Sequence, residues 1–172
     1  MSTFNLGEAR REGMGTISHA ERMKRLKDAA DARSREARGE AVRLVPVVPD
    51  SPEAFTASTP VLYREGYEYY CTARAQHPNS PNRYMFSSLP LQMAFFPFDQ
   101  LDTISPRPLL VIAGSKADTL FWSQDVFRKA KEPKELHIIE GASHMDMYDR
   151  PQFVAPAVAK LAAFFGRQLG KS

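Results

Sequence analysis

Two short polar stretches near the C-terminal end of the chain have residue types that could do acid–base chemistry. The first follows the apolar run 109–114 and ends in Asp118, and the second follows the run 135–141 and ends in His144. A carboxylate that accepts a hydrogen bond from imidazole Nδ1 fixes the tautomer and stabilises the imidazolium formed when the ring takes a proton. Asp118 and His144 are therefore the candidate acid and base of a nucleophilic site. Taken singly, each has a plainer interpretation, since Asp118 can cap a turn and His144 can be a solvated loop residue.

The elements that must position this pair form a strand–helix–strand–helix pattern over residues 106–172. Residues 109–114 are continuously apolar, which indicates a strand buried on both faces, as in a parallel sheet covered by helices. A helix is expected over about 123–131, a second strand over 135–141 and a last helix over 155–169. Such a βαβα unit requires a parallel sheet with a right-handed crossover. Both polar stretches then lie beyond the carboxyl ends of neighbouring strands, where α/β proteins bind ligands.

The N-terminal part is expected to be helical and irregular, with residues 1–16 a loose arm and 17–105 a connecting region. Ser18 and Glu21 form a capping box for a helix over 19–38, whose apolar face is too thin for a central core helix. The tyrosines of a helix over 61–74 favour aromatic packing over ligand stacking. The remaining predicted segments are an extended stretch over 42–49, loops over 51–60 and 76–82 and a short helix over 89–98.

Composition is that of an ordinary globular protein of 172 residues, with 43% hydrophobic and 25% charged residues. The formal net charge is +3, but basic and acidic residues alternate in the densest basic run, which favours a solvated helix face over a nucleic-acid site. A single cysteine excludes an internal disulfide and a Cys-based zinc site. No His pair has metal-binding helical spacing, so we expect neither a metal nor a cofactor. No apolar stretch has the roughly 20 residues of a membrane helix and no signal peptide is recognisable, so we expect a cytoplasmic protein without membrane contact.

The segments LLVIAGSKADTLFWSQDVF and KELHIIEGASHMDMYDRPQFVAPAVAKLAAFF together resemble the C-terminal end of an α/β-hydrolase. They are most similar to bacterial enzymes of the dienelactone-hydrolase and acyl-peptidase-related branch. The upstream segments VRLVPVVPDSPE, YREGYEYYCTARAQHPNSPNR and LDTISPRPLLVIAG resemble the middle of these proteins, cap helices included. The resemblance implies a partial α/β-hydrolase fold with cap-like helical segments, and ester or related acyl-bond hydrolysis through a serine. It also assigns the acid to Asp118 and the base to His144, in the chain order of that family.

The chain departs from this family because it contains no G-x-S-x-G nucleophile motif. Cys71, Ser115 and Ser143 are poor substitutes, since none lies on a strand-to-helix elbow. We therefore expect an acid–base pair without its nucleophile or oxyanion hole, inactive alone or dependent on a missing half for a small acyl or ester substrate. Self-association is expected because missing strands would expose apolar surface. The alternatives are a non-catalytic assembly module that uses an exposed sheet edge and a basic-helix adaptor for an anionic partner.

Overall fold

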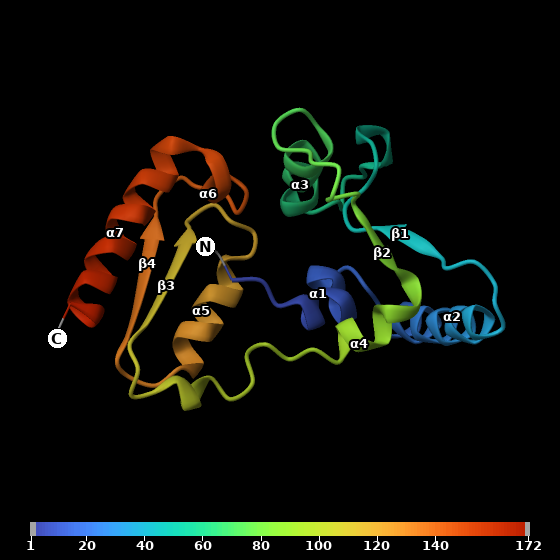
Figure 1. Cartoon of the computed structure of the whole chain (residues 1–172), viewed down its shortest axis with the longest axis horizontal. Coiled ribbons are helices and arrows are strands. Elements are labelled where there is room, and N and C mark those ends of the chain that lie inside the picture. The colour runs from blue at the N-terminus through green and yellow to red at the C-terminus, as the bar shows by residue number, and fades with distance from the viewer. Residues whose placement is uncertain (1–2, 171–172) are drawn as a thin grey trace. The chain divides into compact units, whose positions relative to one another are not determined.

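A computed structural model describes residues 3–170 and contains two compact units (Figure 1). The C-terminal unit comprises Met1–Phe4 and Phe98–Ser172, and the N-terminal unit comprises Asn5–Pro97. No helix in the described part of the chain is long and apolar enough to cross a membrane.

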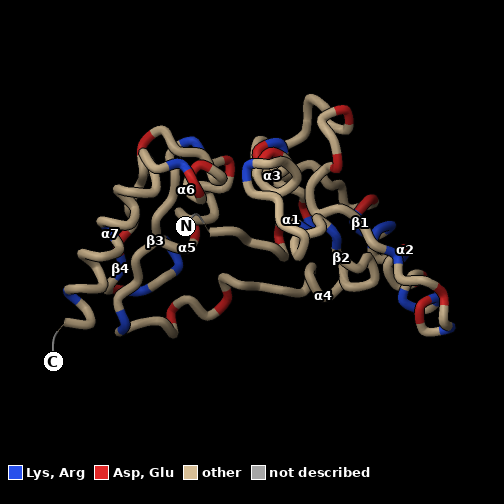
Figure 2. Tube along the Cα trace, turned by 45° about the horizontal axis from the view of Figure 1, so that its top comes forward, with Lys and Arg blue, Asp and Glu red and all other residues tan. Residues whose placement is uncertain are grey.

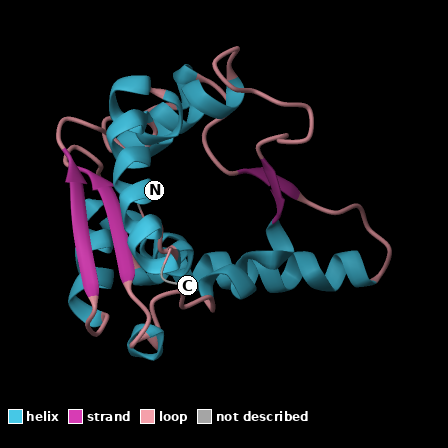
Figure 3. Cartoon of the chain, turned by 60° about the vertical axis from the view of Figure 1, so that its left-hand side comes forward, coloured by secondary structure: helices cyan, strands magenta, loops and turns pink. Residues whose placement is uncertain are grey.

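The C-terminal unit has the predicted βαβα order. Its elements are β3 (Leu109–Gly114), α5 (Leu120–Lys129), β4 (Lys134–Ile139), the short α6 (Asp146–Asp149) and α7 (Pro151–Leu169), with a 3₁₀ turn at Leu101–Ile104 before β3. The two strands pair in parallel, with Leu110 opposite Glu135 and Ala113 opposite Ile138 (Figure 3). The predicted parallel neighbours are therefore confirmed.

Helices cover both faces of this small sheet, with α5 on one side and α7 on the other (Figure 1). The consecutive residues Val111, Ile112 and Ala113 are all buried, as a strand with two covered faces requires. On the α7 side the core holds Ile112 and Ala157 together with residues of the loop after β4. The last helix packs on the strands as expected, although it begins at Pro151, which suits the first turn of a helix.

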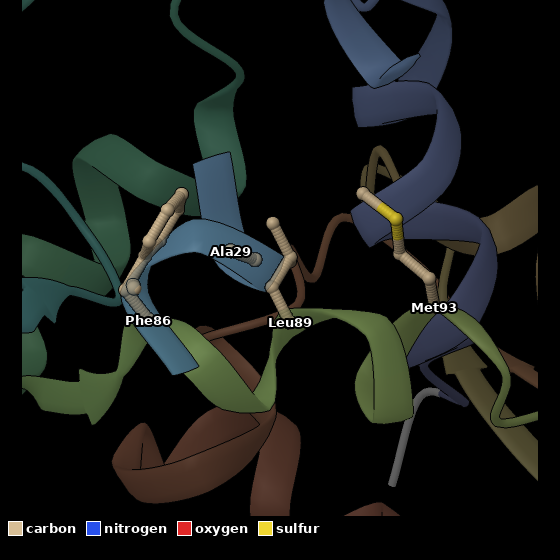
Figure 4. Packing of buried hydrophobic residues seen from close by; sticks show 5 residues of the cluster. Ala29, Phe86, Leu89 and Met93 are labelled. Atoms are coloured by element: carbon tan, nitrogen blue, oxygen red, sulfur yellow. The ribbon is translucent and has the colours of Figure 1, made fainter. Parts of the chain in front are cut away.

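The N-terminal unit is mainly helical. Its elements are α1 (Leu6–Glu12), α2 (His19–Ala37), β1 (Leu44–Pro46), α3 (Val61–Cys71), β2 (Arg83–Met85) and α4 (Leu89–Met93), with 3₁₀ turns at Gly13–Gly15, Pro52–Ala54 and Phe86–Ser88. The strands β1 and β2 pair antiparallel, with Val45 opposite Tyr84. Alanines of α2 pack against Phe86, Leu89 and Met93, and Figure 4 shows Ala29 beside Leu89, with Phe86 and Met93 on either side.

The prediction of a loose arm over residues 1–16 is wrong for residues 6–12, which form α1. The Asn5 side chain accepts a hydrogen bond from the Glu8 N–H at 3.1 Å and so caps the helix. Arg11 donates to the Met93 carbonyl oxygen, and Ala9 is buried. Tertiary contacts therefore hold a helix that is too short to be stable alone.

Charged residues of both signs alternate along α2, as Figure 2 shows. Lys24 pairs with Asp28 at 2.6 Å and Lys27 with Asp31 at 2.7 Å, one helical turn apart. The lysine side chains are largely exposed. This confirms the interpretation of α2 as a helix with a solvated charged face.

Candidate acid–base site

The loops that follow β3 and β4 are tied closely together. A Cβ atom on Gly114 would lie 2.2 Å from the Ala142 carbonyl oxygen, so only glycine permits this approach. The Lys116 N–H donates to the same oxygen at 2.9 Å, and the Gly141 N–H donates to Ser115 Oγ at 2.8 Å. These contacts hold the loop after β3 against the loop after β4.

His144 lies in the loop after β4 and is hydrogen-bonded at both ring nitrogens. Its Nδ1 is 2.7 Å from Thr119 Oγ1, and its Nε2 is 3.1 Å from Tyr148 Oη. The histidine is 4% exposed and Thr119 is fully buried. Two hydroxyl groups therefore fix the orientation of a buried imidazole.

Asp118 lies near the ring, but the hydrogen bond we expected from it is made by the next residue. The group at Nδ1 is the Thr119 hydroxyl, where the prediction placed the Asp118 carboxylate. The Leu120 N–H donates to the Ala117 carbonyl at 3.0 Å, and the turn this bond closes places Thr119 at the start of α5. Asp118 is half-buried and its negative charge acts to raise the pKa of His144.

Burial is the stronger influence on the imidazole. It lowers the pKa of His144 below the ordinary value of 6.5, against the opposing effect of Asp118. The ring is consequently neutral at neutral pH. A neutral imidazole can accept a proton, which is the state a general base requires.

Tyr148 reaches Nε2 because a short helix starts directly after the histidine. Ser143 Oγ accepts from the Asp146 N–H at 3.2 Å, and Asp146 Oδ2 accepts from the Ser143 N–H at 3.0 Å. These reciprocal bonds close the turn that precedes α6, and Tyr148 follows His144 by four residues. Sequence reasoning missed Tyr148 and Thr119, and the four-residue spacing of His144 and Tyr148 is the signal that could have found the tyrosine.

Aromatic groups line one side of the imidazole within the C-terminal unit. The Phe4 ring lies edge-on to Trp122 at 5.0 Å and to His144 at 6.5 Å between ring centroids. The Thr3 hydroxyl is 2.9 Å from Ser123 Oγ, which anchors this segment. The site therefore has an apolar wall next to its base.

The three alternative nucleophiles are not arranged for catalysis. Ser115 and Ser143 both use their Oγ atoms to accept backbone hydrogen bonds that shape the loops. Cys71 belongs to the N-terminal unit, and burial raises the pKa of its thiol above the ordinary value. A raised pKa disfavours the thiolate, which is the reactive form.

Solved structures with similar folds include proteins from bacteria and fungi. The crystal structure of hypothetical protein PA2218 from Pseudomonas aeruginosa matches 96% of this chain and 51% of its own, with a TM-score of 0.83 and 26% identity. The α/β hydrolase GrgF from Penicillium sp. sh18 matches 88% of this chain and 51% of its own, with a TM-score of 0.65 and 22% identity. This chain has a partial α/β-hydrolase fold. A structure of DcsB in complex with its substrate analogue also has a TM-score of 0.65, at 16% identity over 84% of this chain and 52% of its own.

Two curated bacterial proteins are similar in sequence. The uncharacterized protein YcjY of Escherichia coli is 36% identical over 107 residues, and the uncharacterized protein PA2218 of Pseudomonas aeruginosa is 38% identical over 107 residues. These matches cover 62% and 60% of this chain, but only 35% and 28% of the relatives. This chain thus spans about a third of each curated relative and about half of each solved structure. No protein-family model matches it.

Proposed function

We propose that the C-terminal unit carries the acid–base half of a serine-hydrolase site for esters or related acyl bonds. The observation that supports this most is the environment of His144: a buried, neutral imidazole, held at both nitrogens, after adjacent parallel strands of a partial α/β-hydrolase fold. A solvated surface histidine would need neither the burial nor the hydrogen-bond partners at both ring nitrogens. The 172 residues contain no G-x-S-x-G motif, so the nucleophile and oxyanion hole in this proposal come from a polypeptide outside this sequence.

In the proposed reaction His144 Nε2 takes the proton of a serine hydroxyl as its oxygen bonds to the acyl carbon. The imidazolium then gives that proton to the leaving alcohol as the acyl–oxygen bond breaks, and the same exchange with water releases the acid. The serine hydroxyl would replace the Tyr148 hydroxyl at Nε2. Asp118 would stabilise the imidazolium through its charge, and Thr119 would keep Nδ1 oriented.

The chain alone should show no esterase activity, since a base without a nucleophile or oxyanion donors has nothing to activate. The test combines the chain with the polypeptide encoded directly upstream of it, if that polypeptide carries G-x-S-x-G. A fluorophosphonate probe with mass spectrometry then reports which residue is labelled, and a p-nitrophenyl ester reports turnover.

Labelling of the motif serine is expected with the wild-type chain and with the control His137→Ala, whose histidine lies within β4. His144→Ala should lower labelling and turnover by at least about 100-fold, as is typical for loss of a general base. Equal activity with His144→Ala, or turnover by the isolated chain, would contradict the proposal.

A second candidate function is a non-catalytic assembly module. In the described part of the chain β3 pairs with β4 and with no other strand, so one edge of β3 is left for another polypeptide. A parallel edge of this kind is a template for pairing with a further strand. Activity that appears only with an added nucleophile half would favour the first function, whereas association without activity would favour the second.

A further inference from the structure

A second cavity with recognisable chemistry lies within the N-terminal unit. It has a volume of about 300 Å³ and is bounded by α1, α2, α3, the two short strands and the turn after α1. Two arginines line it, Arg10 and Arg25, and no acidic residue does. The cavity is therefore positively charged and has no built-in counter-ion.

Arg10 is held in a fixed orientation by its neighbours. Its Nε donates to Gln92 Oε1 at 2.8 Å, and its guanidinium lies 4.5 Å from the centre of the Tyr84 ring. Tyr84 also lines the cavity. A stacked guanidinium loses little conformational entropy when it binds a ligand, because its plane is already set.

Arg25 differs from the other basic residues of its helical turn. Lys24 and Lys27 pair with aspartates on α2, whereas the Arg25 side chain makes no hydrogen bond, ion pair or ring contact with another described residue. Its side chain is nevertheless half-buried where it lines the cavity. A partly desolvated cation without a partner attracts an anion more strongly than a fully solvated one.

The rest of the wall is mainly apolar, with Thr16 and Tyr63 as polar members besides Tyr84. Ile17 contributes from the turn before α2, and the segment after β1 contributes Pro46, Val47 and Val48, of which Val48 is only 5% exposed. The volume is at the lower end of the range for small-molecule sites, which admits a compact ligand rather than a long chain. Guanidinium groups bind carboxylate and phosphate through paired N–H···O bonds.

We propose that this Arg10–Arg25 cavity binds a small organic anion, with a carboxylate or phosphate group on a compact apolar body. The oxyanion would lie between the two guanidinium groups, and the apolar body would contact Val48 and its neighbours. This site is independent of the proposed acid–base function, because every residue that forms it belongs to the N-terminal unit.

Isothermal titration of the full chain with benzoate and with phenyl phosphate tests the proposal, with benzamide as the neutral analogue. We expect at least one of the two anions to bind, and the tighter one identifies the preferred head group. Benzamide should bind at least about ten-fold more weakly, the difference typical of a charge-assisted over a neutral contact. Failure of both anions to bind, or equal binding of benzamide, would overturn the proposal.

The variant Arg25→Gln should lower the affinity for the anion by about ten-fold or more. Arg33→Gln is the matched control, because Arg33 is exposed on the same helix and does not line the cavity. Arg25→Lys keeps the charge but loses the planar guanidinium group, so its affinity for the anion should lie between those of the wild type and Arg25→Gln. Unchanged affinity in Arg25→Gln would refute the assignment even if the anions bind, since binding would then be elsewhere.

Discussion

The support of the imidazole by Thr119 can be tested through the stability of the C-terminal unit. Thr119 Oγ1 and His144 Nδ1 are 2.7 Å apart, and the two residues are 0% and 4% exposed. In Thr119→Val a methyl group replaces the hydroxyl with little change of shape, so Nδ1 loses its partner in a buried position. A buried polar group without a partner costs about 1–3 kcal/mol. We expect the free energy of unfolding to fall by this amount.

The chain provides a specific probe for the measurement. Its single tryptophan, Trp122, is 1% exposed and belongs to the same unit as the histidine. Urea unfolding followed by tryptophan fluorescence therefore reports on this unit rather than on the N-terminal one.

A double-mutant cycle separates the hydrogen bond from general packing. In a His144→Leu background the ring nitrogen is absent, so Thr119→Val should change the free energy of unfolding little. The difference between the two backgrounds should be about 1 kcal/mol or more, within the range for directly contacting residues. If Thr119→Val lowered the free energy of unfolding equally in both backgrounds, the reasoning would be refuted, because the hydroxyl would then act independently of the imidazole.

Three further predictions concern the same unit and use the same fluorescence signal or sedimentation. Burial lowers the pKa of His144 in the folded chain, so the unfolded chain takes up the proton first as the pH falls below 6.5. The free energy of unfolding should therefore be full above that pH and decline below it, and His144→Leu should flatten the decline. Gly114→Ala should lower the free energy of unfolding by roughly 1–3 kcal/mol, because its Cβ would overlap the Ala142 carbonyl. Gly166→Ala should raise it by about 0.5–1 kcal/mol, because Gly166 lies in α7 and a Cβ there would have nothing within 4 Å. The reverse order of stabilities would contradict the packing described. Sedimentation velocity at micromolar concentration should show association that Phe165→Glu weakens, since Phe165 is 50% exposed, and a clean monomer would count against it.

The parts of the fold that sequence predicted are those with strong local patterns. The continuously apolar run of β3 packs against Ala157 and Leu161 of α7, although Val158 and Phe165 of the same helix are exposed. Parallel pairing of the strands follows from the helix between them. By contrast α1 has seven residues, and its stability comes from contacts with α4 that lie some 80 positions away in the chain. The pairing of β1 with β2 involves three residues on each strand, too few for an alternation to be visible.

The proximity of the loops after β3 and β4 was predictable from the sequence, whereas the residue that contacts His144 Nδ1 was not, and the reason is physical. Topology alone brings the loops after β3 and β4 together, so Asp118 and His144 had to be close. Which side chain reaches Nδ1 depends on the backbone turn between Ala117 and Leu120, because a shift of one position in a turn redirects the side chain entirely. The Thr119 hydroxyl at Nδ1 orients the ring without adding charge, and the charge of Asp118 acts to raise the pKa of the ring. In the proposed site, orientation and charge stabilisation, which one carboxylate performs in the expected pair, would be divided between the adjacent residues Asp118 and Thr119.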